Sequence, residues 1–478
     1  MGPVLVWFRR DLRLSDNPAL AHAVETELDV IPLYILDDDD LEIWRPGAAS
    51  RWWLHGSLES LQRDLEKLGA KLILRRGSAH SVITSIVDAT KASLVLWNRC
   101  YDPGALERDS ALKTALRETG CKAQSFQGSI LFEPWEVRTG SDSPYRVFTP
   151  FWRSCRQRSV AAALEEPKQL SPYSETLPRS DALKSWGLQP SRPDWAGGLR
   201  EAWQVGEAAA QAGLAGFIDD AASSYKQDRD MPGVDGTSML SPHLHFGEIS
   251  PRMIWHAIEA QEPNDGMETF LKEVGWREFC HQLLFHNPTL PNRNLKTEFD
   301  AMPWRDDDEG LRRWRTGQTG YPLIDAGMRQ LWQTGWMHNR VRMVVASFLT
   351  KHLLIDWRDG ERWFWDTLVD ADLASNSAGW QWVAGCGADA APFFRIFNPM
   401  TQSRKFDPKG AYIRTWVPEI ASLSDHDVHE PWSASPAELL AAGVELGVSY
   451  PKPWVEHAFA RQRALNAYKE HVSSSNNG

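Results

Sequence analysis

The fold class is indicated by the first strand-length run, Val4–Phe8 (VLVWF), and by the turn that follows it, Arg9–Leu12 (RRDL). Further apolar runs of strand length occur later, and segments with helical spacing separate them. These runs are Val30–Leu36, Lys71–Leu74, Ser93–Trp97 and Lys122–Phe126. Strands that alternate with helices predict a parallel sheet with helices on both faces. Because RRDL stands where GxGxxG would stand, we expect a Rossmann-like topology without the dinucleotide fingerprint.

The pattern changes twice along the rest of the chain. Leucines at positions 54, 58, 61, 65 and 68, followed by Gly69, predict the clearest helix of the first part. From about Gly128 to Trp195 prolines interrupt the pattern, which predicts a connector running over the surface. From Val205 onward the spacing is helical almost to the end. We therefore expect an α/β domain over residues 1–130, a connector over 131–204 and a large all-α domain over 205–478.

The composition is typical of a soluble globular protein, with 42% hydrophobic and 24% charged residues. Since no stretch suits a membrane span and no signal peptide precedes the first strand, we expect a cytoplasmic protein. The five cysteines are scattered without a CxxC pair, which argues against a metal site and favours a reducing compartment. A net charge of −11 argues against nucleic-acid binding through the overall charge, whereas a local basic face remains compatible with DNA binding.

Two features of the second half suggest chemistry but also have ordinary explanations. The chain contains 24 tryptophans, most of them beyond residue 200, and a large helical core accounts for some of them. The run Asp228–Pro242 combines glycines with hydroxyl side chains near a predicted helix start. Such a turn suits a bound phosphate, and an ordinary helix N-cap explains it as well.

Longer motifs follow this run in a fixed order. They are Trp276–Phe279 (WREF) with Glu273 before it, Gly320–Arg329 (GYPLIDAGMR), Thr334–Met343 (TGWMHNRVRM), and Asp370–Trp382 (DADLASNSAGWQW) continuing to Phe394–Pro399 (FRIFNP). Together with Trp7–Arg13, this ordered set resembles the photolyase/cryptochrome family over nearly the whole chain. The resemblance implies FAD as the cofactor, held inside the helical domain.

Individual positions match those that hold FAD in the family. The residues matched to the phosphates and the ribityl chain are Tyr225, Thr237, Ser238, Met239, Leu240 and Ser241. Those matched to the surroundings of the isoalloxazine ring are Asn339, Arg342, Asp370, Ala371, Asp372 and Asn376. A cation stabilises a reduced, anionic flavin, so we expect Arg342 to serve the ring and Asp370 to pair with it.

Asn376 decides between repair and signalling. It matches the position that faces flavin N5, where an amide can both donate and accept a hydrogen bond. Plant cryptochromes are similar to this chain but carry an acidic residue there, so Asn376 favours repair. Trp380, Trp357 and Trp304 match the family's electron-transfer chain from the flavin to the surface, although all three also fit a helical core.

The resemblance also implies a pocket for a damaged base that leaves the duplex. Trp276 and Trp382 match its aromatic wall, Glu273 its hydrogen-bonding carboxyl group and Met343 an apolar contact. The positions matched to the DNA rim are Arg229, Arg277, Asn339, Arg340 and Gln402, and the charged run Arg404–Lys409 fits either that rim or a solvated loop. Trp336–Arg340 (WMHNR) has a single histidine, which favours cyclobutane pyrimidine dimers in DNA over the (6-4) lesion.

The N-terminal part resembles plant cryptochromes at Ser50–Leu54, Cys100–Pro103 and Glu133–Glu136. Combined with a photolyase-type site, this mixture is similar to class III photolyases. It implies a methenyltetrahydrofolate antenna, with a deazaflavin as the alternative, and Asn98, Arg99 and Tyr101 align with one wall of its site.

We expect a monomeric, light-driven lyase that acts on damaged DNA. The main alternative is a blue-light receptor of the cryptochrome type. A second alternative is a flavin oxidoreductase that works in the dark and has no DNA partner.

Overall fold

The computed structural model describes residues 2–38, 44–390 and 394–472, and the chain divides into two compact units. Unit 1 comprises Met1–Ser223, Ser238–Pro288 and Val369–Asp372, and unit 2 comprises Ser224–Thr237, Thr289–Leu368 and Leu373–Gly478. The predicted domain boundaries at residues 130 and 204 stay a prediction.

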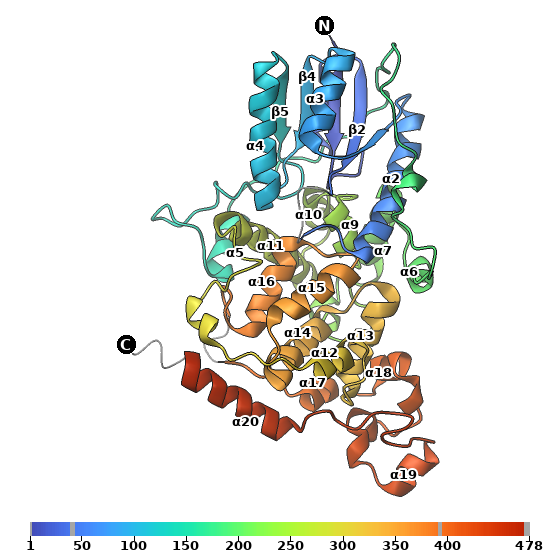
Figure 1. Cartoon of the computed structure of the whole chain (residues 1–478), viewed down its shortest axis with the longest axis vertical. Helices are drawn as coiled ribbons and strands as arrows, with labels where there is room; N and C mark the ends of the chain where they lie inside the picture. Colours follow the sequence, from blue (N-terminus) through green and yellow to red (C-terminus); the bar gives the residue numbers. More distant parts are fainter. Residues whose placement is uncertain (1, 39–43, 391–393, 473–478) are drawn as a thin grey trace. The chain divides into compact units, whose positions relative to one another are not determined.

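Unit 1 contains a parallel sheet of five strands in the order β3-β2-β1-β4-β5 (Figure 1). The strands are β1 (Val4–Phe8), β2 (Val30–Leu36), β3 (Ile73–Arg76), β4 (Leu94–Asn98) and β5 (Lys122–Phe126). The expected Rossmann-like sheet is therefore confirmed. β3 continues past its predicted end at Leu74 because Arg75 and Arg76 pair with Ile35 and Leu36 of β2.

The central strand β1 is buried on both faces, which explains its uninterrupted apolar sequence. Leu5 and Trp7 point into a core that also contains residues of α3 (Ala79–Thr90) and α4 (Pro103–Glu118). α1 (Pro18–Glu25) contacts β1 and β4. The predicted leucine helix is α2 (Ala48–Lys67), and Gly69 follows it with a left-handed φ of 86°, a conformation that favours glycine.

The proline-rich connector covers the edge of this sheet. The Asp181 N–H donates to the Leu74 carbonyl at 2.8 Å, and the Leu74 N–H donates to Ser180 Oγ at 3.0 Å. The edge strand β3 therefore does not expose all of its backbone groups. The connector also contains α5 (Phe148–Arg156), which the broken pattern did not predict; its Pro150 lies in the first helical turn, where proline is tolerated.

Helices make up most of the remaining structure. In unit 1 they are η1 (Leu183–Trp186), α6 (Gly197–Ala202), α7 (Glu207–Asp220), α9 (Ser241–Phe246), α10 (Pro251–Glu259) and α11 (Asp265–His286). In unit 2 they are α8 (Tyr225–Asp228), η2 (Thr297–Ala301), α12 (Asp308–Arg315), α13 (Pro322–Thr334), α14 (Asn339–Ser347), η3 (Phe348–Leu353), α15 (Trp357–Thr367), α16 (Leu373–Ala384), α17 (Pro399–Phe406), α18 (Ala411–Trp416), η4 (Pro418–Ile420), η5 (Asp427–His429), η6 (Pro431–Ser433), α19 (Pro436–Ala441), α20 (His457–Ala467) and η7 (Tyr468–Val472). Within unit 2, α14 and α15 both pack against α16.

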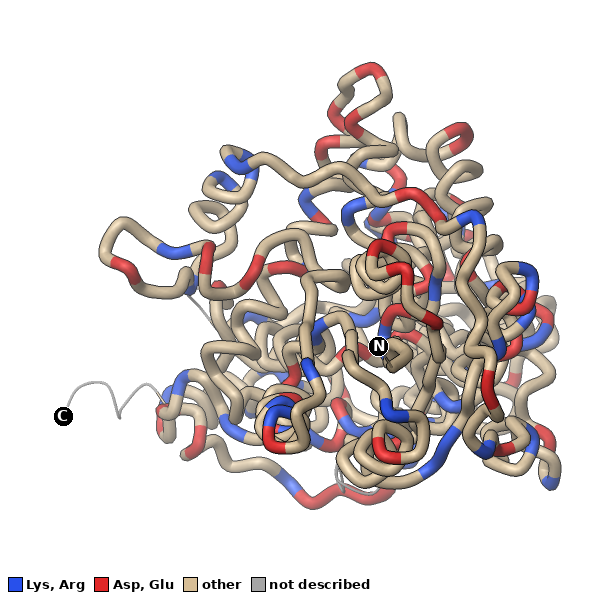
Figure 2. Tube along the Cα trace, turned by 90° about the horizontal axis from the view of Figure 1, so that it is seen from above, with Lys and Arg blue, Asp and Glu red and all other residues tan. Residues whose placement is uncertain are grey.

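The charged residues are mixed along the chain, with Lys and Arg interspersed among Asp and Glu (Figure 2). None of the helices in the described ranges has the length and the apolar character that crossing a membrane requires.

Candidate functional site

One face of α11 carries the residues predicted to meet the lesion. Glu273, Trp276, Arg277 and Cys280 are spaced by three, one and three residues, and each is only half-buried beside fully buried neighbours. This spacing places them on one side of the helix. The Trp276 ring is stacked on Phe148, with the centroids 3.9 Å apart. α11 therefore presents an aromatic ring, a carboxyl group and a cation along one stripe.

The matched carboxyl groups of unit 1 lie just before α16 begins. Asp370 and Asp372 are both buried, and the Asp372 N–H donates to the Asp370 carbonyl at 2.7 Å. Ala371 between them is buried as well. Two acidic residues in a dry turn need compensating positive charge. Sequence reasoning missed one source of it: His281 of α11, whose Nε2 lies 3.5 Å from Asp372 Oδ2.

The predicted phosphate turn has an unusual backbone conformation. Met239 adopts a left-handed φ of 53°, which is rare for a side chain of this size. Leu240 occupies the N-cap of α9, and its side chain makes no capping hydrogen bond. Ser238 Oγ accepts a hydrogen bond from the Leu240 N–H at 3.4 Å, and the phosphate role of Thr237, Ser238 and Ser241 stays a prediction.

In unit 2, the start of α14 groups several predicted residues. The Arg340 guanidinium pairs with Asp230 at 2.9 Å and lies over the Phe406 ring at 4.3 Å. Arg342 Nε donates to the Met337 carbonyl at 2.7 Å. Arg340, Arg342 and Met343 are half-buried and Asn339 is exposed. Arg229 lies over the ring of Tyr225, with 5.5 Å between the guanidinium carbon and the centroid.

The Asn376 amide has a fixed orientation. Its Nδ2 donates to the Glu361 main-chain carbonyl at 3.1 Å, while Glu361 Oε1 accepts a hydrogen bond from Ser377 Oγ at 2.5 Å. Asn376 is 9% exposed, and its Oδ1 accepts no hydrogen bond from the described part of the chain. The amide oxygen is thus available to a donor such as the N5–H group of a reduced flavin.

Of the three predicted tryptophans, Trp380 and Trp357 are buried and Trp304 is not. Trp380 is 3% exposed and Trp357 is fully buried, with its Nε1 donating to Asn294 Oδ1 at 2.9 Å. Trp304 is half-buried. A chain of oxidisable rings that reaches the surface needs one member that is not buried, and Trp304 fits that place. The sequence motifs did not indicate Trp314. Its ring is buried, and the ring centroids of Trp314 and Trp380 are 6.1 Å apart.

Trp382 differs from Trp380 although only one residue separates them. Positions two apart on a helix do not share a face, so Trp380 enters the core and Trp382 stays half-buried. Trp382 Nε1 donates to the Asp389 carbonyl at 3.1 Å. Gln402 of α17 is half-buried, and its Oε1 has no hydrogen-bond partner among the described residues. Both side chains can therefore contact a ligand.

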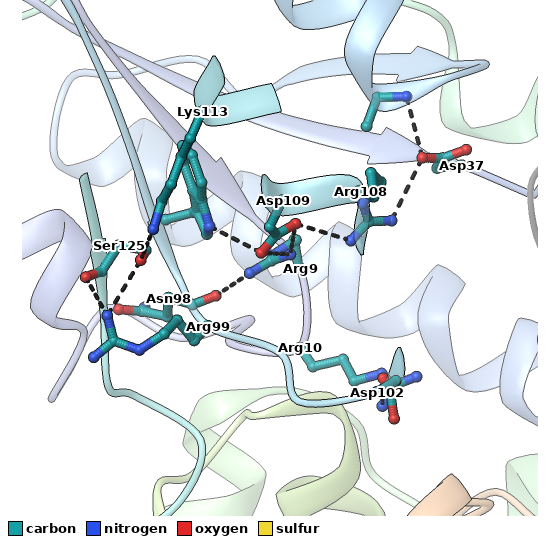
Figure 3. A network of polar contacts seen from close by, with 12 residues as sticks. Arg9, Arg10, Asp37, Asn98, Arg99, Asp102, Arg108, Asp109, Lys113 and Ser125 are labelled. Carbon is teal, nitrogen blue, oxygen red and sulfur yellow. Dashed lines mark hydrogen bonds and ion pairs between the residues drawn. The ribbon is translucent and has the colours of Figure 1, made fainter. Parts of the chain in front are cut away.

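The residues proposed for the antenna lie at the carboxyl end of β4 (Figure 3). Asn98 Nδ2 donates to Asp11 at 2.7 Å and to Asn17 at 2.8 Å, so its amide hydrogens bond within the chain. Arg99 and Tyr101 share the buried Glu133, at 2.5 and 2.8 Å. The role of these residues in binding a chromophore stays a prediction.

A network of ion pairs occupies the switch point between β1 and β4, where open α/β sheets usually bind ligands (Figure 3). Arg9 Nη1 donates to both carboxylate oxygens of Asp109, at 2.8 and 2.9 Å, and Arg108 also approaches Asp109. Arg10 pairs with Asp102 at 2.7 Å. Arg9 and Arg108 both lie over the Trp7 ring. The RRDL turn therefore neutralises buried charge in the place of a phosphate loop.

Comparison with known proteins agrees with this arrangement. Residues 4–169 match the family described as DNA photolyase, and residues 270–470 match the FAD binding domain of DNA photolyase. The chain belongs to the photolyase/cryptochrome family.

Its relatives include both photolyases and cryptochromes. The deoxyribodipyrimidine photo-lyase of Agrobacterium fabrum is 50% identical over 98% of this chain and 98% of its own length. Cryptochrome-2 of Arabidopsis thaliana is 39% identical over 97% of this chain and 78% of its own length. A bacterial class III photolyase from Agrobacterium tumefaciens has a similar structure, with a TM-score of 0.95, 51% identity and coverage of 98% and 97% of the two chains.

The residues present fit FAD, which the matched domain supports as the cofactor. The Asn376 oxygen can accept a hydrogen bond, and α14 supplies a half-buried cation in Arg342. The left-handed turn at Met239 and the buried carboxylates Asp370 and Asp372 offer acceptors and backbone donors of the kind a flavin nucleotide needs. The pairing of Asp370 with Arg342 stays a prediction.

Proposed function

We propose that this chain is a deoxyribodipyrimidine photo-lyase that splits cyclobutane pyrimidine dimers in DNA under light. The observation that carries the proposal is the orientation of Asn376, whose nitrogen is held by the Glu361 carbonyl while its oxygen is available. A neutral amide at this position serves flavin N5 without adding charge, as repair by a reduced cofactor requires. The similarity to the photo-lyase of Agrobacterium fabrum supports the same function.

The side chains place the substrate and stabilise charge. When bound, reduced FAD supplies the light-driven electron that opens the dimer and then receives it back. Trp276 and Trp382 would stack on the flipped bases, Glu273 would accept a hydrogen bond from the pyrimidine edge, and Met343 would make an apolar contact. The side chains that would contact the DNA backbone are Arg229, Arg277, Asn339, Arg340 and Gln402.

Trp380, Trp357 and Trp304 would carry electrons from the surface to oxidised FAD. The partial exposure of Trp304, against the burial of Trp357 and Trp380, supports this direction. This route prepares the reduced cofactor and is separate from repair itself.

For the antenna, we infer methenyltetrahydrofolate near Arg99 and Tyr101, with a deazaflavin as the alternative. Trp135 supports a surface site there, since its ring is 41% exposed, lies 6.4 Å from the Tyr101 ring and is approached by Arg99 at 5.8 Å. An absorption spectrum of the purified protein distinguishes folate from deazaflavin. A spectrum with flavin bands alone would contradict a bound antenna. A monomeric, cytoplasmic protein remains our expectation.

The decisive experiment illuminates the pre-reduced protein with an oligonucleotide that contains one cyclobutane dimer. We expect restoration of the two pyrimidines in the light and none in the dark. A light-stable dimer together with normal flavin photochemistry would favour the cryptochrome alternative, which the similarity to Arabidopsis cryptochrome-2 keeps in view. Equal affinity for damaged and undamaged oligonucleotides, with turnover in the dark, would favour the oxidoreductase.

A further inference from the structure

His281 is a buried titratable group that the proposed function does not use. It lies four residues after Arg277 on α11, so the two residues share a helix face. His281 Nδ1 lies 3.0 Å from the Arg277 main-chain carbonyl, and Nε2 lies 3.5 Å from Asp372 Oδ2. The imidazole is 8% exposed, as is Asp372. The ring is thus held between a carbonyl oxygen and a carboxylate, away from water.

These contacts specify where the protons lie. A carbonyl oxygen can only accept a hydrogen bond, so Nδ1 carries a hydrogen. In a neutral imidazole, Nε2 would then direct a lone pair at the Asp372 carboxylate, and two acceptors facing each other in a dry site repel. A second proton on the ring turns this repulsion into an ion pair. Burial lowers the pKa of His281, and the Asp372 carboxylate and the Arg277 main-chain carbonyl act against that shift. The two acceptors that the ring faces match a His281 imidazolium beside an Asp372 carboxylate.

The surrounding charges support an ionised Asp372. Burial by itself raises the pKa of this carboxyl group, but His281, Arg277, His245 and Arg10 together hold its pKa well below the ordinary value. The titratable and charged groups around the pair come from α11 and from four other segments. They are Glu273, Arg277 and Cys280 on α11, and Arg10, Asp102, His245 and Asp370 elsewhere. Arg10 is itself paired with Asp102. His281 is thus one of several groups that compensate Asp372, and its Nε2 lies 3.5 Å from the carboxylate.

We propose that His281 is a positioning residue that holds a proton against Asp372 and thereby favours the reduced, anionic form of bound FAD over the oxidised form. This inference rests on the proposed function, because Asp372 is one of the residues matched to the flavin ring. Without the imidazolium charge, a reduced ring would approach an Asp372 carboxylate that has lost one of its compensating charges. With it, the pair is neutral overall, and the ring's negative charge meets no net repulsion.

The test compares His281→Gln, which is neutral, with His281→Arg, which keeps a permanent positive charge. Dissociation constants are measured in the dark for oxidised and for chemically reduced FAD with the full-length apoprotein, between pH 6 and 9. We expect His281→Gln to lower the preference for reduced FAD by about tenfold, the effect of roughly one pKa unit of charge interaction. His281→Arg should restore the preference, because it keeps a positive charge beside Asp372. His55→Gln is a matched control, because His55 is also buried and paired with a carboxylate, Glu59, at 3.2 Å.

Each outcome is informative. A His281→Gln protein with the wild-type preference and the wild-type pH profile overturns the inference. If His281→Gln does not retain FAD, His281→Arg decides: restored binding with the wild-type preference for reduced FAD supports a role for charge, and failure to restore binding contradicts it. A wild-type protein that binds FAD but does not repair dimers contradicts the proposed function, and the dark binding measurements still decide the role of His281.

Discussion

At the scale of single residues, Trp304 distinguishes two light reactions: photoreduction of oxidised FAD and dimer repair by reduced FAD. It is the most exposed of the three matched tryptophans, and a ring there can pass an electron hole to solvent. We expect Trp304→Phe to slow photoreduction of oxidised FAD at least tenfold, because phenylalanine is much harder to oxidise. Repair by chemically pre-reduced protein should stay within about twofold of wild type.

Absorption changes under blue light measure the first reaction, and dimer cleavage measures the second. Trp195→Phe serves as the control, since Trp195 is 37% exposed and belongs to no matched chain. Loss of both activities in Trp304→Phe would contradict the electron-transfer assignment.

Glu361 makes the stability of the protein depend on pH. Burial raises the pKa of this carboxyl group to about 8, although the Ser377 hydrogen bond lowers it in part. Between its ordinary pKa and 8, the folded state binds a proton that the unfolded state has lost. The free energy of unfolding therefore falls as pH rises through this window, by up to about 1.4 kcal/mol per pH unit from this one group.

Glu361→Gln keeps an acceptor for Ser377 and removes the ionisation. We expect its free energy of unfolding to fall less steeply than that of wild type between pH 5 and 8, as measured by urea denaturation. Parallel pH profiles for the two proteins would show that Glu361 has an ordinary pKa. Asn376 should be unaffected, because it bonds to the main-chain carbonyl of residue 361.

At the scale of elements, the packing of α15 against α16 holds Trp380 in place. A Cβ atom at Gly360 of α15 would lie 2.1 Å from the Trp380 ring, whereas one at Gly379 of α16 would meet nothing within 4 Å. We expect Gly360→Ala to destabilise the protein by about 1–3 kcal/mol through overpacking, and Gly379→Ala to stabilise its helix by about 0.5–1 kcal/mol. Urea denaturation of both variants measures the difference. Equal stabilities would show that α15 and α16 separate easily at this point.

The elements also show how far sequence patterns reach. The period of the leucines predicted α2, and the alternation of apolar runs predicted five strands, because both features depend on local geometry. The same reasoning missed α5, because Pro150 in its first turn was counted as a residue that interrupts helices. It could not show that Asp181 closes the edge of β3, because that contact joins residues more than a hundred positions apart.

At the scale of the whole molecule, a net charge of −11 coexists with a proposed DNA-binding function. Only the phosphates contacted by the local basic residues should release counterions, so the salt dependence of lesion binding reports a small number of contacts. We expect Arg340→Gln to weaken binding for every sequence and to reduce the slope of log K against log salt by about one.

Arg200→Gln is the matched control, because Arg200 also pairs with an aspartate, Asp194, and is outside the predicted rim. Fluorescence anisotropy with dimer-containing oligonucleotide at several salt concentrations gives both slopes. An unchanged slope for Arg340→Gln would remove this residue from the phosphate contacts.

The sequence by itself determined the fold class, the family and the chemical types of the matched residues, because these depend on periodicity and on ordered motifs. The tertiary structure decided what each side chain contacts. It showed that Glu361 orients the Asn376 amide, that Trp314 contacts Trp380, and that the RRDL turn takes part in an ion-pair network. It also brought His281 against Asp372, ninety-one positions further along the chain. The physical reason is that protonation, orientation and burial are properties of neighbours in space, which a linear pattern does not specify.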